Sequence, residues 1–237
     1  MNGESMKVLK KLLLPIIALA ALAVSNSNAM ENPDKYLFEN YRKKFTENRL
    51  QQYQVNDALK SALDERFQGR RIIHNPLVSK TRKVTLNGKD YYVKLETSRI
   101  IGAELINDLA QDYGLDTVKA LDKRIYQSVA GEYVVVPSIE TTNDPFSLKQ
   151  IKHICKVIKK SAYVDTHREN IFNTKEGVTY FLDTEKTAFA DAHSLKEWQA
   201  EDMQSTLGVV KMQLSMTDEA RAWLTAKMKK NIKTGCC

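Results

Sequence analysis

An Asn-Gly pair between two strand-like runs restricts the fold more than any other feature of this sequence. Residues 82–86 and 91–95 are rich in β-branched and aromatic residues, and Asn87 and Gly88 separate them. Asn-Gly is the strongest short-range signal for a tight hairpin, because both central residues of such a turn take positive φ. The sequence therefore predicts two antiparallel strands that meet at this turn.

A helix and two further strands are predicted to follow the hairpin. Apolar residues recur at helical spacing over residues 100–110, and Gly114 suits the left-handed residue that ends many helices. Residues 116–127 and 132–137 then have strand-like composition. Because Pro137 cannot donate to a ladder, it places the second strand at an edge of the sheet.

Helices are predicted both before and after these strands in the sequence. Residues 33–68 carry aromatic and apolar side chains at helical spacing, Ser147 can cap an amphipathic helix, and the tail over 195–228 is helical with a break near Ser215. A second small hairpin is predicted over residues 171–182. The order indicates an α+β fold with a strand-rich half and a helical half.

The first 29 residues have the pattern of a signal peptide. Three lysines precede an apolar run over residues 12–24, and Ser27, Asn28 and Ala29 offer small residues for cleavage. This run is shorter than the roughly 20 residues that a spanning helix needs. The sequence thus predicts a secreted or periplasmic protein with no stable membrane span after cleavage; an uncleaved membrane anchor is the alternative.

Charge and cysteine content argue against two classes of protein. The net charge of +7 falls to about +5 without residues 1–29, and the lysines are spread along the chain with no arginine-rich block, so we expect no nucleic-acid partner. The only cysteines are Cys155, Cys236 and Cys237, which provide neither a disulfide framework nor zinc-ligand spacing. We expect Cys155 to lie in the core.

Two polar segments carry the clearest chemical signal. In the first, Asp165 is followed after four residues by Asn170 and then by an apolar strand, and in the second, Asp183 lies thirteen residues beyond Asn170, across the predicted hairpin. Mg²⁺ prefers oxygen ligands and shares carboxylates with nucleotide phosphates. The alternative is that the Asp and Asn side chains only make local turn bonds.

In their order and spacing these segments resemble the catalytic loop and the metal-binding Asp segment of the protein-kinase-like superfamily. The resemblance implies that Asp165 accepts or orients the proton of the attacking hydroxyl, and that Asn170 and Asp183 bind Mg²⁺. It also implies that Lys94 neutralises the phosphates of ATP and that Glu104, on the following helix, orients Lys94.

The resemblance spans about residues 70–215 and implies a two-lobed, atypical minimal kinase fold. Its sheet lobe would cover about residues 69–140 and its reduced helical lobe about 141–237, after the signal peptide (1–29) and an N-terminal helical extension (30–68). No glycine-rich loop precedes Lys94, and few residues follow Asp183.

The function predicted from these features is an exported phosphotransferase that uses ATP and Mg²⁺ and transfers a phosphoryl group to an unidentified hydroxyl acceptor. The missing glycine-rich loop and the short helical lobe support an alternative, a catalytically inactive kinase-like scaffold that binds a protein partner. A third hypothesis is an unrelated exported α+β binding protein, in which Asp165 and Asp183 would lie far apart.

Overall fold

The hairpin predicted at Asn87 and Gly88 is present in the structure, a computed structural model that describes residues 32–73, 81–201 and 203–233. Strands β1 (Thr81–Leu86) and β2 (Lys89–Lys94) pair antiparallel, and Asn87 and Gly88 take φ values of 50° and 74°. Both positive values belong to the turn that Asn-Gly favours. This prediction is confirmed.

The hairpin is part of a four-stranded antiparallel sheet in the order β1-β2-β5-β4. Strand β5 (Gly131–Pro137) lies between β2 and β4 (Arg124–Ser128), so the prediction that it forms an edge is wrong. Pro137 is tolerated because it is the last residue of the strand, where the ladder ends.

A second, three-stranded sheet has the order β3-β7-β6. Strands β6 (Ile171–Asn173) and β7 (Thr179–Phe181) form the predicted second hairpin, and β3 (Val118–Ala120) pairs with β7 in parallel. The single strand predicted over 116–127 is therefore two strands, β3 and β4, in two different sheets.

The predicted central helices form with the expected ends. Helix α5 (Ser98–Asp112) is followed by Gly114 at φ 61°, and the amide of Leu115 donates to the carbonyl of Ala110 at 2.7 Å. Helix α6 (Leu148–Ser161) begins with a capping box in which Ser147 and Gln150 exchange side chain–backbone hydrogen bonds.

The two ends of the described chain are helical, as predicted. The first part contains η1 (Pro33–Tyr36), α2 (Phe38–Arg42), α3 (Glu47–Gln51) and α4 (Asp57–Phe67). After the short η2 (Lys186–Ala188), the last part contains α7 (Leu195–Glu201), α8 (Met203–Gln213) and α9 (Asp218–Lys233), and the break near Ser215 is confirmed.

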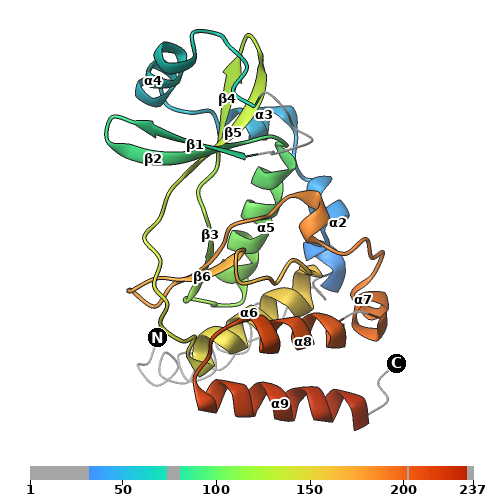
Figure 1. Cartoon of the computed structure of the whole chain (residues 1–237). Coiled ribbons are helices and arrows are strands. Elements are labelled where there is room, and N and C mark those ends of the chain that lie inside the picture. The colour runs from blue at the N-terminus through green and yellow to red at the C-terminus, as the bar shows by residue number, and fades with distance from the viewer. Residues whose placement is uncertain (1–31, 74–80, 202, 234–237) are drawn as a thin grey trace, which may run out of the picture.

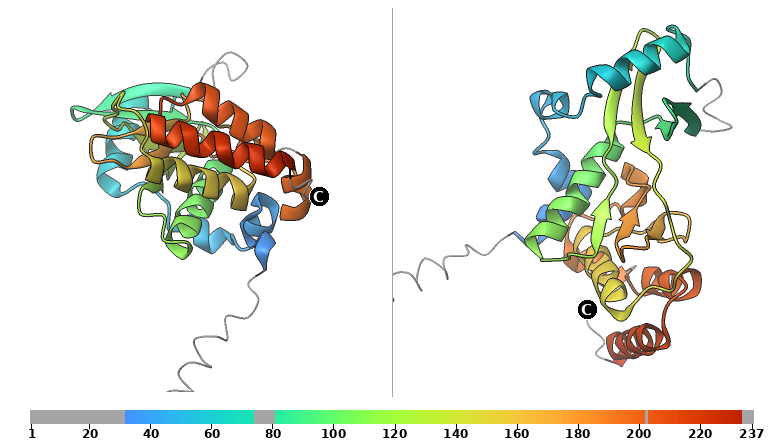
Figure 2. Two further views of the ribbon diagram at one scale, coloured as in Figure 1. Left: turned by 90° about the horizontal axis from the view of Figure 1, so that it is seen from below. Right: turned by 90° about the vertical axis from the view of Figure 1, so that its left-hand side faces the viewer.

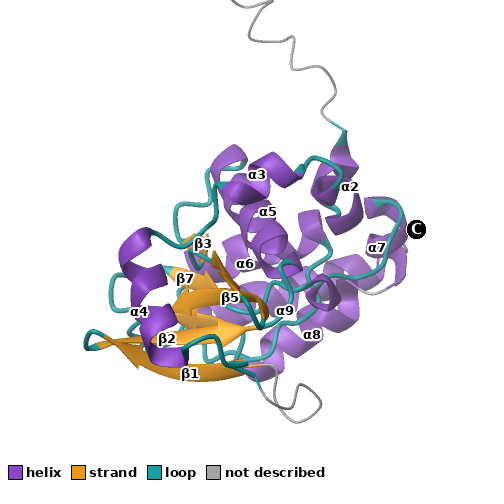
Figure 3. Cartoon of the chain, turned by 90° about the horizontal axis from the view of Figure 1, so that it is seen from above, coloured by secondary structure: helices purple, strands orange, loops and turns teal. Residues whose placement is uncertain are grey.

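The molecule is α+β, with strand-rich and helical halves that are compatible with a two-lobed arrangement (Figure 1). Helix α4 packs on the four-stranded sheet through Leu63 and Phe67, whereas α6, α8 and α9 gather at the opposite end (Figure 2). Viewed from above, the strands of the larger sheet lie to one side of α5 (Figure 3). Helix α5 thus connects the two halves.

A small apolar cluster joins the sheet to the segment that precedes Asp183. It contains Ile100 of α5 together with Val134 and Val136 of β5, and Tyr180 and Leu182 pack against it. This packing brings the end of β7 close to the sheet.

The predicted signal peptide and the terminal cysteines Cys236 and Cys237 lie outside the described residues. Within the described ranges, no helix is both long enough and apolar enough to span a membrane.

Candidate functional site

The loop with the first polar motif lies between α6 and β6. Ala162 ends α6 at φ 57°. The backbone amides of Val164 and Asp165 then donate hydrogen bonds to the carbonyl of Ala188, with N···O distances of 2.9 and 3.4 Å. At the far end of the loop, the amide of Leu182 donates to the carbonyl of Asn170 at 2.9 Å. The backbone therefore brings this loop alongside the segment that contains Asp183.

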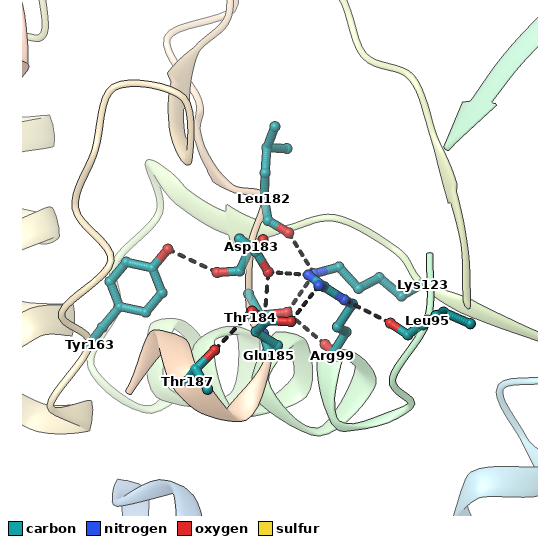
Figure 4. Close-up of polar contacts among 9 residues, drawn as sticks. All are labelled: Leu95, Arg99, Lys123, Tyr163, Leu182, Asp183, Thr184, Glu185 and Thr187. Atoms are coloured by element: carbon teal, nitrogen blue, oxygen red, sulfur yellow. Dashed lines mark hydrogen bonds and ion pairs between the residues drawn. The ribbon is translucent and has the colours of Figure 1, made fainter. Parts of the chain in front are cut away.

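The residues Leu182–Glu185, here called the 182–185 segment, are bonded to their surroundings on several sides (Figure 4). The guanidinium of Arg99 pairs with the carboxylates of Asp183 and Glu185. On another side, the hydroxyl of Tyr163 donates to the carbonyl of Asp183 at 2.8 Å. Asp183 is thus held through both its side chain and its backbone.

A lysine that is completely enclosed supports the same segment. Lys123 is 2% exposed, and its ammonium donates to the carbonyl of Leu182 at 2.7 Å and to the hydroxyl of Thr184. Burial lowers the pKa of Lys123 well below its usual value, and the nearby Lys94 lowers it further.

Gly102 lets α5 approach this segment closely. A Cβ atom added at Gly102 would overlap the carbonyl oxygen of Thr184 and lie 2.8 Å from Cε2 of Phe189. One turn earlier in the helix, the hydroxyl of Thr184 donates to the carbonyl of Arg99 at 2.6 Å. Only glycine allows this contact between a helix and a backbone carbonyl.

Lys94, at the end of β2, faces these carboxylates without touching them. Burial lowers the pKa of Lys94, and the carboxylates of Asp183, Glu185 and Asp165 oppose that shift. Within the described chain, no carboxylate oxygen lies within 4.0 Å of its ammonium. The ammonium of Lys94 is therefore partly desolvated and has no direct ion pair.

The pKa of Asp165 reflects the same grouping of charges. Burial raises the pKa of the Asp165 carboxyl, a hydrogen bond with Asn170 lowers it, and the nearby Asp183 raises it again. The structure therefore brings together Lys94, Asp165, Asn170 and Asp183, from three places in the sequence.

Glu104, the residue expected to orient Lys94, is directed elsewhere. Its carboxylate forms a hydrogen bond with the hydroxyl of Tyr53. Burial is the larger cause and this hydrogen bond the second cause that raise the pKa of Tyr53 to about 12. The structure does not bring Glu104 to Lys94, because Glu104 and the inward-facing Arg99 are five residues apart, which is about 140° around a helix. Arg99 is the residue of α5 that reaches the site.

The donor set fits a magnesium ion that arrives with a nucleotide. The described residues contain no group of three or more His, Cys, Asp or Glu side chains arranged to hold a metal by themselves. Asp183 and Asn170, with Asp165 nearby, provide carboxylate and amide oxygens. Mg²⁺ is commonly held by one or two carboxylates and completes its coordination with phosphate oxygens and water.

Arg99 and Lys123 were not predicted from the sequence. A weak signal for Lys123 exists, because it lies at alternate positions with Leu121 and Ile125, both of which are buried. Arg99 directly precedes the buried residues Ile100 and Ile101 in α5. Neither pattern distinguishes a buried cation from one at the surface.

No protein-family model matches the sequence, and no curated protein matches it.

Proposed function

We propose that this protein is a kinase-like phosphotransferase that transfers a phosphoryl group from ATP, with Mg²⁺, to a hydroxyl acceptor. The observation that supports the proposal is the grouping of Lys94, Asp165, Asn170 and Asp183 on the facing ends of a sheet and two loops. An ammonium, a hydrogen-bonded carboxylate and an oxygen pair suited to Mg²⁺ are the groups that phosphoryl transfer requires.

Each residue has a distinct role in this proposal. Lys94 binds the nucleotide phosphates, and because it has no direct ion pair with any described residue, its ammonium is available to them. Asp183 and Asn170 hold Mg²⁺, which supplies positive charge next to the phosphates when it is bound. Asp165 accepts or orients the proton of the acceptor hydroxyl, and its raised pKa suits a proton acceptor.

Ligand-induced stabilisation and turnover, measured together on the wild-type protein and two variants, test the proposal. A ligand that binds only the folded state raises the apparent Tm, and at 100 times its Kd it stabilises by about 2.7 kcal/mol. We expect ATP with Mg²⁺ to raise the Tm of the wild-type protein and of Asp165→Asn, and to have little effect on Asp183→Asn. Hydrolysis or transfer of the γ-phosphate should fall roughly 10²-fold or more in Asp165→Asn.

Asp122→Asn is the matched control for these aspartate variants. Asp122 pairs with Arg124 at the surface, at 3.0 Å, and the control should behave as the wild-type protein. If ATP with Mg²⁺ stabilises neither the wild-type protein nor Asp165→Asn, the phosphotransferase proposal fails.

A second candidate, a kinase-like scaffold without turnover, is favoured by one specific observation. The carboxylate of Asp183 already has a cationic partner within the protein, because Arg99 pairs with it. A scaffold of this kind would show no Mg²⁺-dependent stabilisation by ATP, so the same measurement separates the two candidates.

A further inference from the structure

The guanidinium of Arg99 is one of the most constrained charged groups in the described structure. Its side chain is 3% exposed, and each of its three nitrogens has a separate acceptor. Nε donates to the carbonyl of Leu95 at 2.9 Å, Nη1 pairs with Oδ1 of Asp183, and Nη2 pairs with Oε2 of Glu185. A planar fork that is bonded through each of its three nitrogens has little freedom to move.

Asp183 is engaged through only one of its two carboxylate oxygens. Oδ1 accepts from Arg99 and lies 3.5 Å from the amide of Glu185, whereas Oδ2 has no hydrogen bond or ion pair within the described part of the chain. The side chain is 23% exposed, which leaves room for a ligand. Arg99 therefore fixes Oδ1 of Asp183, and Oδ2 is available to a ligand.

Glu185 differs from Asp183 in this respect. Its Oε2 pairs with Arg99, and its Oε1 accepts from the hydroxyl of Thr187 at 2.8 Å. Both oxygens of Glu185 are therefore engaged within the protein, so Glu185 acts as the second anchor of the guanidinium and Asp183 remains the carboxylate with a free oxygen.

We propose that Arg99 is a positioning residue of the site, which holds Asp183 by Oδ1 and keeps Oδ2 as the oxygen available to a divalent cation. This inference rests on the proposed function, because it assigns the metal to Asp183. Groups that orient a metal ligand without touching the metal commonly affect metal affinity 10- to 100-fold. The opposite role, a built-in cation that takes the place of the metal, predicts the opposite effect on metal affinity.

Arg99→Lys separates these roles, because lysine keeps the charge but cannot bind two carboxylates as a planar fork. Mn²⁺ serves as the probe in place of Mg²⁺ and is titrated in the presence of a saturating non-hydrolysable ATP analogue. The relaxation rate of water protons reports protein-bound Mn²⁺. We expect Arg99→Lys to raise the half-saturating Mn²⁺ concentration about tenfold or more. A purely structural Arg99 would lower the Tm of the unliganded protein and leave this concentration unchanged.

Arg124→Lys is the matched control, since Arg124 also binds an aspartate but does so at the surface, and it should titrate as the wild-type protein. If Arg99→Lys does not fold, Glu185→Gln weakens the second anchor without changing Asp183 and should shift the titration in the same direction. An unchanged or lower half-saturating concentration in the folded variant overturns the proposal. A wild-type protein that does not saturate with Mn²⁺ overturns the proposed function, and this inference with it.

Discussion

Helix α5 is held at its two ends by different chemistry. At its first turns, Arg99 and Gly102 contact the 182–185 segment, where the charged and polar groups are enclosed. At its last turns, Asp108 and Asp112 accept hydrogen bonds from two tyrosines of the N-terminal part of the chain, and these carboxylates are 42% and 45% exposed. Water can replace lost bonds at the second end but not at the first, so the first end should tolerate far less change.

Gly102→Ala should have the largest effect on stability. The added methyl group would overlap the carbonyl oxygen of Thr184, and neither the helix nor this backbone can move without breaking other contacts. We expect a loss of about 3 kcal/mol in the free energy of unfolding. Urea unfolding followed by far-UV circular dichroism measures the loss.

Gly208→Ala is the matched control for Gly102→Ala. Gly208 lies in α8, and among the described residues a Cβ there would meet only Cε of Met228, at 3.9 Å. Alanine is the better helix former, so the control should gain about 0.5–1 kcal/mol. Equal effects at the two positions would contradict the close contact of α5 with the 182–185 segment.

Thr184→Val tests the buried hydrogen bonds at the same end of α5. Valine has nearly the shape of threonine but cannot donate to the carbonyl of Arg99 or accept from Lys123. Because Lys123 and the carbonyl of Arg99 each lose one buried hydrogen bond, we expect a loss of about 2 kcal/mol in urea unfolding. The exposed Thr187 provides the control, because Thr187→Val should change stability by less than about 0.5 kcal/mol. Equal losses would mean that burial does not distinguish the two hydroxyls.

The elements around this helix were predictable where the signal was local. The Asn-Gly turn, the Gly114 end of α5 and the Ser147 cap each depend on a few neighbouring residues, and all three are present in the structure. The parallel pairing of β3 with β7 joins residues about sixty apart in the sequence, and the interior place of β5 depends on two partners. Such pairings are set by tertiary packing, which composition and periodicity do not encode.

The candidate site divides in the same way. The order and spacing of Asp165, Asn170 and Asp183 predicted their grouping, since a short hairpin connects them. The side chains of β2 alternate between its two faces, which does not by itself decide whether Lys94 points inward or to solvent. The sequence could not show whether Glu104 or Arg99 reaches the site, because both lie on α5. Only the packing of that helix decides which of its sides faces the site. In the structure, Arg99 and not Glu104 faces the site.

At the other end of α5, Tyr41→Phe should have a moderate effect. The hydroxyl of Tyr41 donates to Asp108, and the ring is 1% exposed, so the substitution removes a bond and keeps the packing. Asp108 is open to water and has Arg49 nearby, at 3.9 Å. We therefore expect a loss of only about 1 kcal/mol in urea unfolding. Tyr92→Phe, at an exposed position of β2, should change stability by less than about 0.5 kcal/mol. A loss at Tyr41 as large as that of Gly102→Ala would break the contrast between the two ends.

Asp112→Asn should have the smallest effect, and one that depends on pH. A hydrogen bond from Lys35 and a second from Tyr36 lower the pKa of the Asp112 carboxyl. A carboxyl whose pKa is lower in the folded state adds stability above its unfolded pKa of about 3.9, and this contribution is lost as the pH falls through the folded pKa. Because Asp112 is 45% exposed, we expect a difference from the wild-type protein below about 1 kcal/mol near pH 7, shrinking towards zero near pH 3. Asp191→Asn, at an exposed aspartate without a hydrogen-bonding partner among the described residues, is the control and should change stability by less than about 0.5 kcal/mol near pH 7. A difference between Asp112→Asn and the wild-type protein that grows on acidification would contradict this prediction. The hydrogen bonds of the charged Asp112 would then not be what stabilises the last turns of α5, and the two ends of the helix would have to be compared on packing alone.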